Sequence, residues 1–172
     1  MAIPDFAAIT CFVFDVDGVM TDGSLLVMPG GLMARRMNIK DGYALQLAIK
    51  KGYRVVVISG GHAPEVADRL AKLGVTEMHF QVKDKAAVLQ RVLQIPITAP
   101  EKILYMGDDV PDLPALRLAG LPCCPADAAE EVKALSVFIS QLNGGMGCVR
   151  QVIEKVLRLR GDWHDDFQIP SR

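Results

Sequence analysis

Short apolar runs alternate along the chain with longer segments in which apolar residues recur at helical spacing. The runs that we predict to be strands cover residues 11–15, 54–59, 77–81, 103–107, 121–124 and 136–139. The segments that we predict to be helices cover residues 42–51, 64–73, 85–93, 112–119, 128–135 and 147–157. This alternation is typical of a mainly parallel sheet covered by helices. The pattern therefore predicts an α/β protein.

One segment, residues 23–39, interrupts the alternation. It lacks a helical period and carries Pro29, Gly30 and Gly31 between two apolar runs, which favours a β-hairpin flap. No other insertion is long enough to form a cap domain over a site. The pattern stops after residue 160, so we expect one domain over residues 1–160 and a C-terminal tail over residues 161–172.

Acidic residues cluster directly after two of the predicted strands. Asp15 and Asp17 follow the first strand, and Asp108, Asp109 and Asp112 follow the fourth. Functional groups of α/β proteins gather at the carboxyl ends of the strands, so the two clusters are expected to meet at one edge of the sheet. Carboxylates without a nearby histidine suit a hard cation, and the sequence therefore predicts a Mg²⁺ site.

Two further elements complete a predicted phosphate site. Ser59 and Gly60 follow the second strand, where a hydroxyl and backbone amides can hold phosphoryl oxygens. Lys85 follows the third strand and can neutralise the remaining negative charge. Each element alone is common in loops, but all four occur in order at successive strand ends.

Taken together, these elements resemble the four motifs of haloacid dehalogenase-type phosphatases. The matching segments are residues 14–23, Ser59-Gly60, Lys85, and Gly107-Asp108-Asp109 with Asp112. The resemblance implies a Rossmann-like three-layer sandwich, mainly parallel, with the small flap and no cap domain.

Within that superfamily, nearly the whole chain resembles the 3-deoxy-D-manno-octulosonate 8-phosphate phosphatases. The additional matching segments are residues 21–23, 38–42, 125–128 and 143–150. This resemblance implies hydrolysis of a sugar-acid phosphate in lipopolysaccharide sugar synthesis. It also implies a cytoplasmic homotetramer whose flaps and tails complete the sites of neighbouring subunits.

The resemblance also implies residue roles. Asp15 would be the nucleophile that forms an aspartyl-phosphate, and Asp17 would be the general acid and base that also contacts the substrate. Ser59, Gly60 and Lys85 would bind the phosphoryl group. Mg²⁺ would be held by the Asp15 carboxylate, the Asp17 main-chain carbonyl and the Asp108 carboxylate. Asp109 and Asp112 would orient Asp108, Lys85 or metal-bound water.

In many relatives the second motif continues with an arginine, whereas this chain has Gly61 and His62. This departure leaves the identity of the sugar acid open, and a sialic acid or related nonulosonate 9-phosphate is the alternative substrate. A non-catalytic domain that assembles with a sugar-nucleotide synthetase is a second alternative, against which the complete motif set argues. A two-component receiver domain is a third, but it carries its phospho-acceptor on a middle strand and not after the first.

Composition narrows the class of partner. The 172 residues carry a formal net charge of −1, which excludes the basic footprint of a nucleic-acid-binding protein. No apolar run approaches the length of a membrane-spanning helix, and we expect no membrane association. The opening residues lack a secretion signal, and the four cysteines have no metal-binding spacing, so we expect buried thiols in the cytoplasm.

Overall fold

The computed structural model describes residues 5–94 and 98–170. Residues 1–4, 95–97 and 171–172, which belong to the predicted domain and tail, lie outside the described residues. The centre of the molecule is a six-stranded sheet in the order β5-β4-β1-β6-β7-β8, in which every neighbouring pair is parallel. The predicted α/β class is therefore confirmed.

The strands lie at the predicted places, and all except β7 are slightly shorter than predicted. They are β1 (Cys11–Phe14), β4 (Arg54–Ile58), β5 (Glu77–His79), β6 (Ile103–Met106), β7 (Leu121–Cys124) and β8 (Phe138–Ile139). Strand β1 lies between β4 and β6 in the middle of the sheet, and its four residues are all buried. A strand covered on both faces reads as a continuous apolar run, which explains the first run in the sequence.

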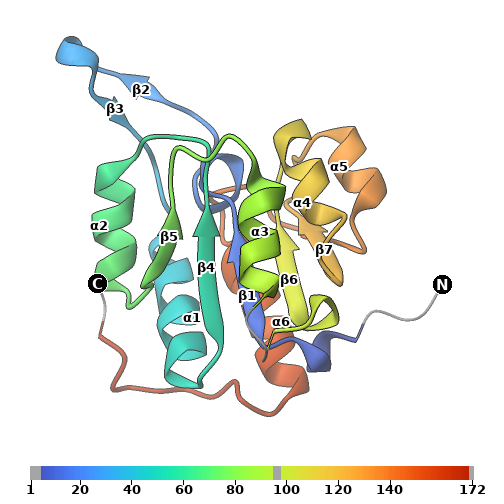
Figure 1. Cartoon of the computed structure of the whole chain (residues 1–172). Coiled ribbons are helices and arrows are strands. Elements are labelled where there is room, and N and C mark those ends of the chain that lie inside the picture. The colour runs from blue at the N-terminus through green and yellow to red at the C-terminus, as the bar shows by residue number, and fades with distance from the viewer. Residues whose placement is uncertain (1–4, 95–97, 171–172) are drawn as a thin grey trace.

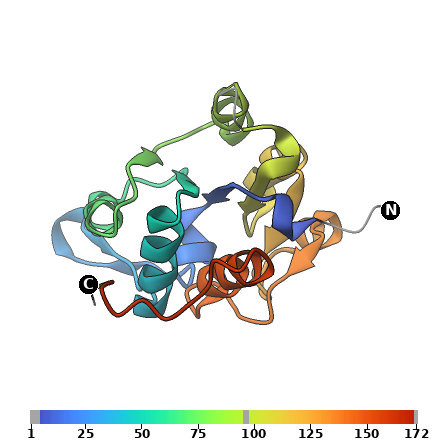
Figure 2. The same ribbon diagram turned by 90° about the horizontal axis from the view of Figure 1, so that it is seen from below.

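Helices cover both faces of the sheet. They are α1 (Ile39–Lys50), α2 (Pro64–Lys72), α3 (Lys85–Leu93), α4 (Leu113–Leu116), α5 (Glu130–Leu135) and α6 (Cys148–Leu159). Figure 2 shows α1 and α6 on one face and α3 and α4 on the other. Two separate apolar cores result, one for each face, because side chains of a strand alternate in direction. The structure is thus the predicted three-layer sandwich.

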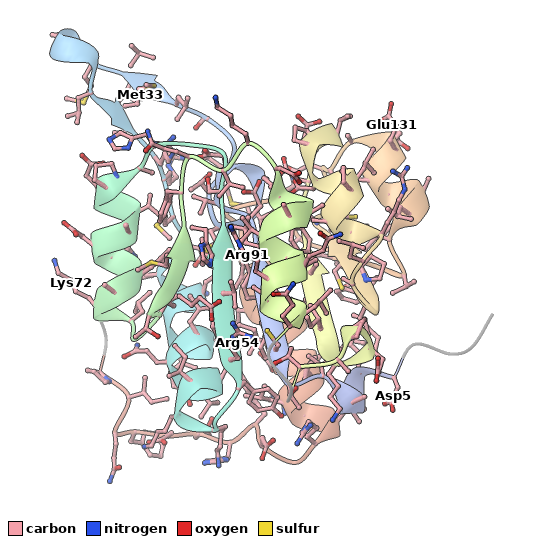
Figure 3. The ribbon with its side chains drawn as sticks, viewed as in Figure 1. Asp5, Met33, Arg54, Lys72, Arg91 and Glu131 are labelled. Atoms are coloured by element: carbon pink, nitrogen blue, oxygen red, sulfur yellow. The ribbon has the colours of Figure 1, made fainter. Side chains whose placement is uncertain are left out.

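The segment after β1 forms the predicted flap. Strands β2 (Leu26–Val27) and β3 (Met33–Ala34) pair antiparallel and form a second, two-stranded sheet. Figure 1 shows this hairpin projecting beyond the carboxyl ends of the central strands. Figure 3 marks it by Met33, which stands away from the body of the molecule. Helix α1 begins at Ile39, three residues earlier than predicted, because the Asn38 side chain accepts a hydrogen bond from Lys40 N and caps it.

The segment after α6 lies along helix α1. The Tyr43 hydroxyl donates to the His164 carbonyl oxygen at 3.1 Å, and Lys50 pairs with Asp166 at 2.6 Å. The Trp163 ring packs edge-on against the Tyr43 ring, and the Arg150 guanidinium lies 5.3 Å from the Trp163 ring centroid. These contacts hold the described part of the tail against its own chain. Within residues 5–94 and 98–170, no helix combines the length and the apolar character needed to cross a membrane.

Candidate active site

The loop that follows β1 places two aspartates at the carboxyl edge of the sheet. Residues Val16–Met20 form a loop that is closed by a hydrogen bond from Thr21 N to the Val16 carbonyl oxygen at 3.0 Å. Within it Gly18 has a φ of +84°, a conformation that favours glycine. A Cβ at this position would overlap the Asp108 carboxylate, so the missing side chain also allows the second acidic loop to approach. The buried Thr21 hydroxyl accepts hydrogen bonds from Gly18 N at 3.3 Å and Gly23 N at 3.4 Å.

Asp15 is joined to the opposite side of the site by a buried polar network. Lys85, the first residue of α3, places Nζ 3.0 Å from Asp15 Oδ2 and 2.8 Å from Asp112 Oδ1. The Tyr105 hydroxyl donates to the same Asp112 oxygen at 2.8 Å. Asp112 Oδ2 accepts from the backbone N–H groups of Asp108 at 3.2 Å and Asp109 at 3.4 Å. Both oxygens of the Asp112 carboxylate thus accept hydrogen bonds. Asp112 thereby fixes the positions of Lys85 and of the backbone at Asp108 and Asp109.

Several carboxyl groups crowd together at this edge, and the pKa values of two of them are raised. Burial, together with the charge of Asp112, raises the pKa of Asp15 to about 7, although Lys85 acts in the opposite direction. Burial and the Asp15 charge raise the pKa of Asp108 to about 8. Two carboxyl groups that resist ionisation side by side create a demand for additional positive charge.

The residues present fit a hard divalent cation. Oxygens of Asp15, Asp108 and Asp112 lie within 4.8 Å of one another. Asp15 Oδ1 is buried, and no hydrogen-bond partner for it occurs among the described residues. Because Asp112 is already fully hydrogen-bonded, the oxygens left to bind a cation are those of Asp15 and Asp108. A carboxylate-only donor set of this kind suits Mg²⁺ better than zinc.

The loop after β4 forms the next wall of the site. The buried Ser59 continues from the strand and is held by its N–H, which donates to the His79 carbonyl oxygen at 2.8 Å. Its hydroxyl accepts from Gly61 N at 3.1 Å, which keeps the loop of Ser59, Gly60 and Gly61 tightly turned. A hydroxyl and open backbone amides at this place can receive phosphoryl oxygens.

Asp17 faces a different environment from Asp15. Its carboxylate is paired with Arg35 of the flap, whose Nε lies 2.6 Å from Oδ1 and whose Nη2 lies 3.4 Å from Oδ2. The Asp17 side chain is 37% exposed, whereas the Arg35 side chain is only 6% exposed. The flap therefore contributes a buried charged group to the site.

One cavity of about 350 Å³ collects the residues that the sequence predicted for the site. Its walls include Asp15, Asp17, Ser59, Gly60, Lys85 and Asp108, together with Asp109 and Asp112. Sequence reasoning did not assign a place in the site to Tyr105, because an isolated tyrosine within an apolar strand has no motif. Arg35, which pairs with Asp17, belongs to none of the motifs either.

Other candidate residues lie outside this cavity. Asp41 is buried in α1, where its Oδ1 accepts from Arg150 N at 2.8 Å and thereby joins α1 to the start of α6. Burial raises the pKa of Asp41 to about 6. Lys40 and His62 are exposed. These residues serve packing or lie at the surface, and none of them lines the cavity described above.

A parallel sheet with paired aspartates after its central strand, a serine loop, a buried lysine and a late acidic loop defines a phosphatase of the haloacid dehalogenase superfamily. No family model matches the chain. It is 32% identical over 153 residues to the 3-deoxy-D-manno-octulosonate 8-phosphate phosphatase KdsC of Escherichia coli K12. The aligned segment covers 89% of this chain and 81% of that protein. The chain belongs to the family of 3-deoxy-D-manno-octulosonate 8-phosphate phosphatases.

Solved structures agree with this assignment. The 3-deoxy-D-manno-octulosonate 8-phosphate phosphatase of Yersinia pestis matches with a TM-score of 0.88 and 30% identity, over 91% of this chain and 85% of that one. The enzyme of that name from Moraxella catarrhalis, crystallised with magnesium, phosphate and the sugar acid, matches with a TM-score of 0.87 and 29% identity. The match covers 91% of this chain and 90% of that one.

Proposed function

We propose that this protein hydrolyses the phosphate monoester of 3-deoxy-D-manno-octulosonate 8-phosphate in lipopolysaccharide sugar synthesis. The observation that carries the proposal is the convergence of the four motifs on one cavity at the carboxyl edge of the sheet. The relative from Escherichia coli K12 is 32% identical to this chain over the 153 aligned residues, and the Moraxella structure contains magnesium, phosphate and the sugar acid.

Asp15 is the proposed nucleophile. One of its carboxylate oxygens forms a bond to phosphorus while the bond between phosphorus and the sugar oxygen breaks. Asp17 donates a proton to the departing sugar oxygen, so that an alcohol and not an alkoxide leaves. In the second half of the reaction, Asp17 takes a proton from a water molecule whose oxygen attacks the aspartyl-phosphate. Inorganic phosphate is released and Asp15 is restored.

The remaining residues bind charge and fix geometry. Lys85, 3.0 Å from Asp15 Oδ2, faces the phosphoryl group, and the Ser59 hydroxyl with the Gly60 amide binds its oxygens. Asp15 and Asp108 carboxylates, with the Asp17 main-chain carbonyl, would hold Mg²⁺. When bound, the cation would neutralise the repulsion between an anionic carboxylate and an anionic phosphate.

We further propose that residues 1–160 form one cytoplasmic catalytic domain and that four copies assemble with shared sites. The flap supports this assembly, because its apolar residues Leu26 and Val27 are 65% and 72% exposed. A lone two-stranded hairpin is marginally stable in water. A light-scattering mass of four chains that falls for Leu26→Ser would support the assembly, and a monomeric wild type would contradict it.

The test of the activity is phosphate release with Mg²⁺ across a panel. The panel contains the octulosonate 8-phosphate, a sialic acid 9-phosphate, a hexose 6-phosphate and 4-nitrophenyl phosphate. We expect the octulosonate ester to be preferred and chelation of the metal to abolish release. A preference for the nine-carbon ester would assign the alternative substrate, and no release from any ester would overturn the activity.

A further inference from the structure

Arg35 differs from the rest of the flap in the direction of its side chain. Most flap side chains are exposed, and the side chain of the adjacent Arg36, which lies beside Asp22, is 78% exposed. The Arg35 side chain is 6% exposed and turns toward the site instead. A charged group is buried at such a place only when it is paired, and here its partner is Asp17.

The contact is geometrically specific. The guanidinium touches both oxygens of the Asp17 carboxylate, at 2.6 Å through Nε and at 3.4 Å through Nη2. Its third nitrogen, Nη1, donates to the Met33 carbonyl oxygen at 3.4 Å and ties the group to strand β3. A planar donor fork that meets both oxygens of a carboxylate fixes its rotation as well as its position.

Gly61 provides the space in which this pair lies. A Cβ built on Gly61 would be 2.8 Å from Asp17 Oδ2 and 3.2 Å from Arg35 Nη2. The backbone N–H of Gly61 donates to the Ser59 hydroxyl, so the pair lies directly beside the phosphate-binding loop. The glycine therefore lets a flap arginine reach the acid–base group.

We propose that Arg35 is a positioning residue that holds Asp17 through Oδ1, at 2.6 Å from Nε, and so sets the angle at which the loosely contacted Oδ2 carries the proton and passes it to the leaving oxygen. The flap and the acid–base group then act as one unit, and Gly61 is required for their contact. This inference rests on the proposed phosphatase activity and on the role of Asp17 within it.

Such a role has a kinetic signature that depends on the leaving group. A sugar alkoxide leaves poorly and needs the proton from Asp17, whereas 4-nitrophenolate leaves without much assistance. The value of kcat/KM includes departure of the leaving group but not hydrolysis of the aspartyl-phosphate. Loss of positioning therefore lowers kcat/KM for the sugar ester far more than for the aryl ester.

The experiment compares Arg35→Gln, Arg35→Lys and the matched control Arg36→Gln in the full-length, Mg²⁺-loaded protein. For Arg35→Gln we expect kcat/KM to fall about 100-fold on the octulosonate ester and less than about fivefold on 4-nitrophenyl phosphate. Arg35→Lys keeps the charge, and its kcat/KM on the octulosonate ester should be about tenfold higher than that of Arg35→Gln. Arg36→Gln should match the wild type. The oligomeric mass of each variant is measured alongside.

A second variant reaches the same pair without changing any charge. Gly61→Ala places a methyl group against Asp17 Oδ2, and the short carboxylate must rotate away from Arg35. We expect the same selective loss on the sugar ester, with thermal unfolding close to that of the wild type. Calorimetric binding of the product, 3-deoxy-D-manno-octulosonate, should be unchanged in both Gly61→Ala and Arg35→Gln.

The outcomes separate the inference from the function on which it rests. Equal losses on both esters, or weakened product binding that accounts for the whole effect, would show that Arg35 binds substrate or supports the fold, and would overturn the positioning role. Wild-type protein that releases phosphate from no ester would overturn the proposed activity and the inference with it. An active wild type with an unaffected Arg35→Gln variant would overturn the inference alone.

Discussion

Asp15 and Asp17 are separated by one residue yet occupy opposite kinds of environment. Asp15 is buried and pairs with Lys85. Lys85 in turn pairs with Asp112, and both of these residues are buried as well. Asp17 is half-buried and held by Arg35 from the flap, in which residues 23–34 are all exposed. The first carboxylate is fixed by the core, and the second is fixed by a peripheral hairpin.

The difference suits the two proposed roles. A nucleophile must stay at one point in line with phosphorus, which a network of buried hydrogen bonds achieves. A general acid and base must exchange protons with the leaving group and with water, which requires some exposure. The same residue type thus serves two tasks because its surroundings differ. The following changes test that contrast, in order of expected effect.

Replacing the core-held carboxylate should have the largest effect. Asp15→Asn removes the anionic oxygen that attacks phosphorus, and we expect a loss of at least ~10⁴-fold in phosphate release from every ester. Circular dichroism and thermal unfolding would establish that the fold is retained. Turnover above about one per cent of the wild type would show that another group is the nucleophile.

Replacing the flap-held carboxylate should cost less and discriminate between esters. Asp17→Asn is expected to lower kcat/KM on the sugar ester by about 10²–10⁴-fold and to affect 4-nitrophenyl phosphate less. Because Asp17 also activates water, rapid mixing should reveal a burst of nitrophenol equal to the enzyme concentration. Identical losses for both esters and no burst would mean that the two aspartates do not divide the work as proposed.

The binding of metal and the pH should change the stability of the protein through the buried carboxyl groups Asp15 and Asp108. Asp15 and Asp108 have pKa values of about 7 and 8 in the folded chain, above the ordinary value of 3.8. The metal-free folded state therefore binds more protons than the unfolded state between about pH 4 and 8, and its stability falls as the pH rises through that window. Mg²⁺ should raise the Tm by roughly 5–10 °C at pH 8.

The same addition should raise the Tm much less at pH 5, where protons already occupy these carboxyl groups. Differential scanning calorimetry at both pH values measures the contrast. Asp108→Asn is the matched variant, because it removes one of the repelling charges. It should raise the Tm of the metal-free protein at pH 8 by about 2–4 °C and lose the response to Mg²⁺. An equal Mg²⁺ response at both pH values would contradict the electrostatic account.

The smallest effect is expected from a change at Tyr105, which contacts Asp112 and does not line the cavity. Tyr105→Phe removes the hydroxyl that donates to Asp112 Oδ1 and leaves Lys85 on that oxygen. We expect unfolding to become easier by about 1 kcal/mol, with a loss in kcat of about tenfold because Lys85 is less firmly held. Denaturant unfolding and steady-state kinetics measure the two quantities. A loss as large as that of Asp17→Asn would place Tyr105 closer to the chemistry than its position indicates.

Most of the fold and much of the site could be predicted because local patterns determine them. The run Phe12, Val13 and Phe14 is apolar throughout since β1 is covered on both faces, and that condition is visible in sequence. The gathering of Asp15, Ser59, Lys85 and Asp108 follows from the rule that functional groups collect at the carboxyl ends of parallel strands. The roles of these residues remain predictions.

The contributions of Arg35 and Tyr105 could not be predicted in the same way. Arg35 and Arg36 are adjacent and chemically identical, and only the twist of the hairpin decides which one points inward. In the sequence, Tyr105 cannot be told from any other aromatic residue of a buried strand. Only the structure shows that its hydroxyl donates a hydrogen bond to Asp112. Both depend on side-chain contacts that only the folded chain brings together, Arg35 with Asp17 across 18 positions and Tyr105 with Asp112 across 7.

The four cysteines make the chain convenient for chemical labelling. Cys11, Cys123, Cys124 and Cys148 are free thiols buried in the body, and burial raises the pKa of Cys11 and Cys148 to about 12. Thiolates are the reactive form, so maleimide reagents should leave the native thiols untouched in the folded protein. One cysteine introduced at Glu130, whose side chain is 88% exposed and lies outside the flap, would therefore accept a fluorophore selectively, without first removing any natural thiol.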